Sequence, residues 1–190
     1  MKILKLPLLL LLPSFLCIVI NFIFVDEGLL LIGLFSLILS ICNLNKSKFD
    51  IIKSIVFTLI ASFVVFGVAI LNYIIVGFVL EKLTVLSFFN FSISGIDLNY
   101  LLQVAFFSPL FLFYGYKYIF KISFTYITYL IIFIAILLLI ILGIAQLKHG
   151  NKYYFGILEF WQIIIAFGIQ LILYQDELKK MIISKSNSNM

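Results

Sequence analysis

The chain of 190 residues contains no arginine, one histidine and two cysteines. Arginine is the side chain that holds phosphates through paired hydrogen bonds, so the clamp typical of lipid-phosphate enzymes is absent. His149, Cys17 and Cys42 lie on separate segments and do not form a metal-ligand set. The apolar runs contain no nucleophile, histidine and acid set, and the sequence has no glycine-rich nucleotide loop. We therefore predict no enzyme, no metal site and no cofactor.

Charge is scarce as well. Charged residues make up 11% of the chain and apolar residues 65%, against about 25% and about 45–50% in soluble domains. So large an apolar surplus has to face lipid, and the length suits one domain. The net charge of +5 comes from lysines dispersed between apolar runs, which argues against nucleic acid as a partner. We expect a single integral membrane domain whose partner is the lipid bilayer.

A helix needs about 20 apolar residues to cross a bilayer. Six runs approach or exceed this length, namely 7–25, 28–42, 54–80, 98–116, 123–147 and 153–174. The second run is short, so the first two form either a tight helical hairpin, which we prefer, or one spanning helix beside a re-entrant or interfacial helix. The predicted fold class is an all-α polytopic membrane bundle of six transmembrane helices, followed by a short tail over 175–190.

The lysines orient these predicted helices. If both termini are cytoplasmic, ten of the thirteen lysines lie in the cytoplasm, and only Lys82, Lys148 and Lys152 lie outside. Cytoplasmic loops carry such an excess, and the sorting requires both of the first two runs to span. The first run is longer than the apolar core of a signal peptide and no cleavage site follows it, so we expect it to be retained. The predicted location is the inner or plasma membrane.

The segment between the third and fourth runs alternates apolar and polar residues from Phe89 to Ser94. Alternation with period two indicates an extended or interfacial piece; the alternative is a short amphipathic helix lying on the membrane. Gly95 and Asp97 are expected to form a turn into the fourth run. An ordered cap over the bundle is favoured over a substrate lid.

The sixth run is the most informative because it contains Glu159. A charged side chain near the bilayer centre costs about 2.5–3.5 kcal/mol on insertion scales. Spacings of three and four place it on one helix face with Lys152, Gly156, Gln162, Ala166, Gln170, Tyr174 and Glu177. We expect this face to point to other helices or to water, with Glu159, Gln162 and Gln170 as tentative substrate-binding or helix-docking residues. A purely structural role for Glu159, as a hydrogen-bond donor, is about equally favoured.

The other runs also carry small and polar residues at helical spacing, which favours close packing between spans. They are Ser14, Cys17 and Asn21 in the first run, Gly33, Ser36 and Ser40 in the second, Ser54, Thr58, Ala61 and Asn72 in the third, Asn99 and Gln103 in the fourth, and Thr125, Thr128, Ala135 and Gln146 in the fifth. Pro13 and Pro109 lie inside two runs, and we expect kinks there. The two cysteines differ in predicted depth by about 9 Å, at about 1.5 Å per residue, so we expect them to be free and buried.

Two functional hypotheses remain open. In the first, the protein binds or transports a small solute along the polar face around Glu159. The length and predicted topology resemble the substrate-binding subunits of energy-coupling-factor vitamin importers, which implies solute binding, although the small-x-x-x-small motif of their first span is not evident here. In the second, the protein is a non-catalytic assembly, immunity or regulatory subunit, and its polar face docks other membrane subunits.

Overall fold

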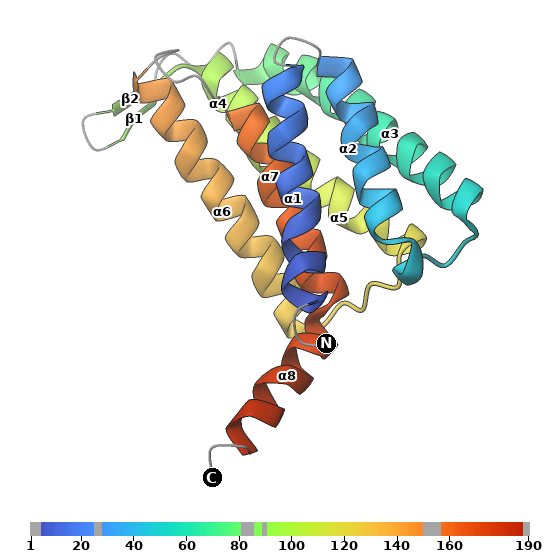
Figure 1. Ribbon diagram of the computed structural model, residues 1–190. Helices are drawn as coiled ribbons and strands as arrows, with labels where there is room; N and C mark the ends of the chain where they lie inside the picture. The colour runs from blue at the N-terminus through green and yellow to red at the C-terminus, as the bar shows by residue number, and fades with distance from the viewer. Residues whose placement is uncertain (1–4, 25–27, 81–85, 89–90, 150–156, 188–190) are drawn as a thin grey trace.

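The computed structural model describes residues 5–24, 28–80, 86–88, 91–149 and 157–187, and this part of the chain is almost entirely helical (Figure 1). Side chains at the edges of these ranges, including those of 157–159 and 182–187, are not described. In chain order the elements are α1 (Lys5–Ile23), α2 (Gly28–Cys42), the 3-10 turn η1 (Leu44–Lys46), α3 (Ile51–Leu80), β1 (Leu86–Phe88), β2 (Phe91–Ile93), α4 (Gly95–Leu101), the π-helical segment η2 (Leu102–Phe107), α5 (Ser108–Ile119), α6 (Tyr126–His149), α7 (Ile157–Leu173) and α8 (Gln175–Asn187).

Within the described residues, four helical stretches are long and apolar enough to cross a membrane: Leu6–Ile23, Ile51–Leu80, Gly95–Ile119 and Tyr126–Lys148. The helices over the second and sixth predicted runs are apolar but shorter, Gly28–Cys42 and Phe160–Leu173. The predicted helical bundle with long apolar helices is therefore confirmed. The third and fourth helices extend beyond the predicted runs at one or both ends, and the predicted tail forms α8.

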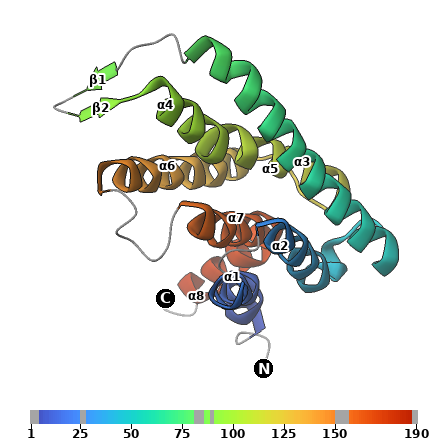
Figure 2. The same ribbon diagram turned by 90° about the horizontal axis from the view of Figure 1, so that it is seen from above.

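Successive long helices run in opposite directions, so α1 begins at the end of the bundle where α7 finishes (Figure 1). We call this the lysine end; it contains η1, the link 120–125 and the α7–α8 junction. The opposite end carries the β1–β2 hairpin and is called the hairpin end. Seen from above, α3 starts close to α2 and diverges from it toward α4 (Figure 2).

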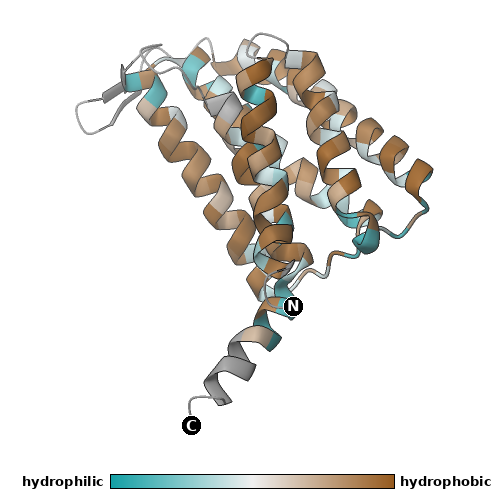
Figure 3. Cartoon of the chain, in the orientation of Figure 1, coloured by the Kyte–Doolittle hydropathy of each residue, from teal (hydrophilic) through white to brown (hydrophobic). Residues whose placement is uncertain are grey.

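The polarity of α3 is inverted relative to a soluble helix. Its buried residues include Ser54, Thr58 and Ser62, whereas Ile52 and Ile75 are 75% and 66% exposed. A soluble protein tends to bury its large apolar residues and leave hydroxyls at the surface. In lipid the inverted arrangement is favourable, because apolar side chains meet acyl chains and hydroxyls bond inside the bundle. Figure 3 shows apolar residues over the long helices and hydrophilic residues gathered toward their ends.

The buried hydroxyls of α3 join it to α2 and α5. Ser54 Oγ lies 3.3 Å from Ser40 Oγ, and Ser62 Oγ lies 2.7 Å from the hydroxyl of Tyr116, which is fully buried. Thr58 donates to the carbonyl oxygen of Ser54 within the same helix. Hydrogen bonds between membrane helices contribute about 0.6 kcal/mol each on average. The close helix packing predicted at Ser40 and Ser54 is confirmed by this contact.

The fourth apolar run forms one continuous helical stretch with a wide turn in its middle. Pro109 has no N–H to donate to a residue one turn earlier. Just before it, the Ser108 N–H bonds to the Gln103 carbonyl, five residues back, and η2 is π-helical. In such a π-turn the N–H bonds the carbonyl five residues back instead of four, so the turn contains one more residue. A π-helical segment thus lies just before Pro109, and the kinks predicted at Pro13 and Pro109 stay predictions.

The extended segment predicted before the fourth run is confirmed where it is described. β1 and β2 pair antiparallel, with Ser87 opposite Ser92. The predicted turn at Gly95 and Asp97 is wrong, because both residues lie in the first turn of α4. Ser94 caps this helix: its hydroxyl accepts from the Asp97 N–H at 3.1 Å and donates to the Asp97 carboxylate at 2.7 Å. This reciprocal cap satisfies a free N–H at the helix start.

Candidate functional site

A cavity of about 750 Å³ lies in the hairpin-end half of the bundle. Its walls come from α2, α3, the Gly95–Ile119 stretch and α7, with Asn21 of α1 at its edge. Two of these helices, α2 and α7, begin at the hairpin end, whereas α3 ends there (Figure 1). A volume of this size is in the range of small-molecule sites, about 300–1,000 Å³.

The cavity walls are mainly apolar and aromatic. Aromatic rings come from four helical segments, and the rings of Phe35 and Trp161 lie 5.6 Å apart between centroids. Phe66, Tyr73 and Tyr100 add three further rings to the wall. None of the described lining residues carries a charge. Such walls favour an uncharged ligand with an apolar body, because a charged group would lose its hydration without gaining a partner.

Two neighbouring residues of α7 bring polar atoms that no described group satisfies. Gln162 is only 6% exposed, and its Oε1 has no hydrogen-bond partner. The indole Nε1 of Trp161 is also buried without a partner. Both residues line the cavity. An unsatisfied buried polar group costs about 1–3 kcal/mol, so the cavity wall contains one acceptor and one donor that lack their hydrogen bonds.

Gln103 of the cavity wall is paired with two amides that do not line the cavity. Asn72 Nδ2 donates to Gln103 Oε1 at 2.9 Å, and Gln103 Nε2 donates to Asn99 Oδ1 at 3.4 Å. Asn99 Nδ2 in turn donates to the carbonyl oxygen of Tyr73 at 2.7 Å. This chain of bonds holds α3 against α4 and η2. The predicted polar residues Asn72, Asn99 and Gln103 therefore serve helix packing here, and Gln103 and Tyr73 also shape the cavity.

The polar face predicted along the sixth run points inward from Gln162 to Tyr174, whereas Glu177 at its end is partly exposed. Gln162, Ala166, Gln170 and Tyr174 are all buried. Gln170 does not line the cavity, however, and neither of its amide atoms has a hydrogen-bond partner among the described residues. The structure thus separates the two glutamines: Gln162 lies at the cavity, and Gln170 is enclosed two turns closer to the lysine end. A binding role for Gln170 stays a prediction.

Glu159 is the third residue of α7 as that helix is described, near the hairpin end of the bundle. The energetic cost that applies at the bilayer centre therefore does not transfer directly to this position. The side chain of Glu159 lies outside the described residues. Its predicted role as a binding or docking residue stays a prediction.

Sequence reasoning missed Trp161, which contributes the donor beside Gln162. Its indole sits next to the predicted polar face, and it is the one tryptophan of the chain. Tryptophan usually bonds its N–H to a partner when buried. A lone tryptophan adjoining an intramembrane polar face was the available signal.

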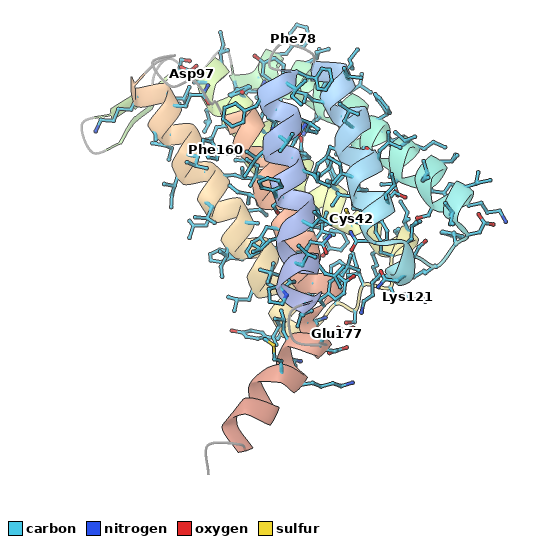
Figure 4. All side chains as sticks on the ribbon, in the orientation of Figure 1. Cys42, Phe78, Asp97, Lys121, Phe160 and Glu177 are labelled. Carbon is cyan, nitrogen blue, oxygen red and sulfur yellow. The ribbon has the colours of Figure 1, made fainter. Side chains whose placement is uncertain are left out.

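The lysine end is closed by hydrogen bonds between loops. An isolated antiparallel bridge pairs Ser47 with Phe120, and the Lys48 N–H donates to the Ile119 carbonyl at 2.9 Å. The Lys121 N–H donates to the Lys46 carbonyl at 2.8 Å. Figure 4 shows Lys121 at this end and Asp97 at the other. The α2–α3 and α5–α6 links are therefore tied together across the base of the bundle.

The same α2–α3 link is tied to the end of α7. Lys46 forms an ion pair with Glu177 and lies 4.7 Å from the ring centroid of Tyr174. The Tyr174 hydroxyl donates to Asn45 Oδ1 at 3.3 Å. Partial burial alone would raise the pKa of Glu177, but the hydrogen bond from Lys46 outweighs it, and the pKa is lower than usual. Glu177, predicted on the polar face, thus joins α8 to the α2–α3 link through its ion pair with Lys46.

Cys17 and Cys42 are both free, as predicted; Cys17 is fully buried, but the predicted burial of Cys42 is wrong, because that residue is only partly buried. Over the described ranges, no group of three or more His, Cys, Asp or Glu side chains could hold a metal ion.

A function for this protein is inferred from the chemistry of the cavity. The resemblance of length and expected topology to vitamin-importer subunits stays a prediction. Comparison of the chain with protein-family models, curated proteins and solved structures finds no match.

Proposed function

We propose that this is a six-span protein of the cell membrane, with both termini cytoplasmic, that binds a small uncharged solute in the cavity beside Trp161 and Gln162. The lysines support this orientation. Lys46, Lys48, Lys53, Lys117 and Lys121 belong to the lysine end, and Lys148 belongs to the hairpin end. Cytoplasmic loops carry the lysine excess, so the hairpin end faces outward in this proposal.

The short helices α2 and α7 are the weakest part of a six-span arrangement. At about 1.5 Å per residue they measure about 22 and 25 Å, below the roughly 30 Å of the hydrocarbon core. Each lies beside a longer helix, α2 against α3 and α7 against α1. Short spans are accommodated by local thinning of the bilayer or by packing against neighbours, which supports counting both.

The observation that carries the binding proposal is the buried Gln162 Oε1 without a partner in the cavity wall. In a membrane interior no bulk water is available to satisfy it. The nearby Trp161 N–H supplies the complementary donor. One hydroxyl or amide group on a bound solute can satisfy both atoms, and the aromatic walls accept its apolar body.

Native mass spectrometry of the purified protein, after incubation with cell extract, tests the proposal. The expected result is a bound small molecule on the wild type that is lost in Gln162→Leu. The matched control is Gln170→Leu, the same change on the same helix but outside the cavity, and it should retain the molecule. A wild type that carries no molecule, or equal retention in both variants, would contradict the proposal. Loss of a co-purifying membrane protein in both variants would instead indicate helix docking.

A further inference from the structure

The cavity reaches the outer surface of the bundle between α2 and α3. Leu29 and Ile70 line it yet are 63% and 45% exposed, and Phe66 and Tyr73 are exposed as well. Lining the cavity does not by itself produce this exposure, because Phe35, which also lines it, is 1% exposed. The exposed lining residues therefore mark the mouth of the cavity.

This mouth follows from the angle between the two helices. At the lysine end α2 and α3 touch, with Ser40 Oγ 3.3 Å from Ser54 Oγ. Toward the hairpin end α3 leaves α2 and crosses to α4, where Asn99 bonds the Tyr73 carbonyl (Figure 2). The two helices thus form a V, and the cavity fills its open half.

The surface around the mouth is apolar. On α3, the neighbouring side chains Leu71, Ile74 and Ile75 are exposed, and they belong to a helix of 30 residues that is long enough to cross a bilayer. A helix face of this kind contacts acyl chains rather than water. The mouth therefore opens sideways into the membrane.

We propose that the cavity admits its ligand laterally from the bilayer, and that this ligand is an uncharged amphiphile dissolved in the membrane. Its head, a hydroxyl or amide, accepts a hydrogen bond from Trp161 Nε1 and donates one to Gln162 Oε1. Its apolar tail passes between Leu29 and Ile70 into the lipid. The polar part of this inference rests on the proposed function; the lateral opening does not.

The buried end of the cavity and its mouth differ in polarity, and this difference favours an uncharged amphiphile. The buried end offers a donor and an acceptor without any described charge, so the charged head of an ordinary phospholipid is disfavoured there. The apolar mouth offers nothing to a strongly hydrated solute. A molecule with a small polar head and an apolar tail matches both regions.

The single tryptophan makes the opening directly measurable, because Trp161 lines the cavity and no other residue contributes indole fluorescence. The protein is reconstituted into phosphatidylcholine vesicles with or without bromine on the acyl chains. We expect brominated chains to quench Trp161 at least twofold more than iodide added to the water. Ala69→Phe, which enlarges a lining residue at the mouth, should at least halve quenching by the brominated lipid.

The matched control is Val64→Phe, which enlarges an exposed residue of α3 that does not line the cavity, and it should quench like the wild type. Stronger quenching by iodide, or no effect of Ala69→Phe in a folded protein, would overturn lateral access. Mass spectrometry of an organic extract of the purified protein identifies the occupant: an uncharged amphiphile is expected, and a charged or strongly hydrated molecule would overturn the ligand class. A lateral opening without any co-purified molecule would refute the proposed binding alone.

Discussion

The two ends of this bundle use their polar side chains differently, although the lysine end also holds two buried oxygens without a described partner, Asn43 Oδ1 and Glu177 Oε2. At the lysine end, Lys46, Tyr174 and Glu177 bond to one another or to neighbouring loops. In the hairpin-end half, the indole N–H of Trp161 and the amide oxygen of Gln162 are buried without a described partner, and both residues line the cavity. Buried polar atoms that bond one another stabilise one arrangement, whereas unsatisfied ones reward a ligand that supplies the missing bond.

The largest effect is expected for Gln162→Leu at the hairpin-end half. The substitution leaves the ligand head with an unpaired donor, which costs about 1–3 kcal/mol, so affinity should fall about 5- to 150-fold. The stability of the ligand-free protein should not fall, because an unsatisfied acceptor is removed. Titration of the co-purified ligand, with thermal unfolding in parallel, measures both. If the free energy of unfolding fell by as much as the free energy of binding, the proposed difference between the two ends would be contradicted.

The second prediction concerns Gln103 of the cavity wall and the two amides that it bonds. Gln103→Leu removes the acceptor of Asn72 and the donor to Asn99. Because Asn72 is partly exposed, we expect a loss of about 1–2 kcal/mol in unfolding free energy. Chemical denaturation in detergent measures it, with Gln170→Leu on α7 as the control, because neither amide atom of Gln170 has a described hydrogen-bond partner. An unchanged midpoint would mean that this wall is not held by its amides.

A smaller effect is expected at the lysine end from Tyr174→Phe. The variant loses the hydroxyl that donates to Asn45 but keeps the ring beside Lys46. One neutral hydrogen bond contributes about 1 kcal/mol, so stability should drop by about that amount with unchanged ligand affinity. A change in affinity would show that the lysine end is coupled to the cavity.

The smallest effect is a pH dependence at Glu177. Its pKa is lower in the folded protein than in the unfolded chain because Lys46 bonds the carboxylate. The stabilisation is therefore present above the unfolded pKa and is lost as the pH falls through the folded pKa. Thermal unfolding of the wild type and Glu177→Gln should differ at neutral pH and converge in acid. Asp176→Asn, next to it in the chain, is the control; the same convergence there would point to general acid destabilisation.

Much of the fold follows from local sequence because the bilayer imposes one length and one hydrogen-bonding solution. Apolar run length predicts the helices, and helical spacing predicts that Gln162 and Gln170 face inward. The start of α4 is also predictable from the sequence, since Ser94 and Asp97 have the spacing of a reciprocal cap. Gly95, however, favours a turn at the same place.

The cavity itself could not be predicted. It exists because α3 diverges from α2, and that angle depends on the Ser40–Ser54 contact at one end and the Asn99–Tyr73 contact at the other. Likewise, Trp161 becomes an unsatisfied donor only because its surroundings happen to be Phe35 and an open space. These are relations between distant segments, which spacing along one helix does not contain.

The wide turn at Leu102–Phe107 is equivalent to one additional residue in an otherwise regular helix. Each residue rotates a helix by about 100°, so this turn sets the angle between Tyr100 on one side of it and Leu112 on the other, both of which line the cavity. Removal of a single codon here would turn Asn99 away from α3 while leaving composition and hydropathy almost unchanged. The geometry of the cavity thus depends on the rotation of residues about this helix axis. An insertion or deletion would alter it more than most substitutions.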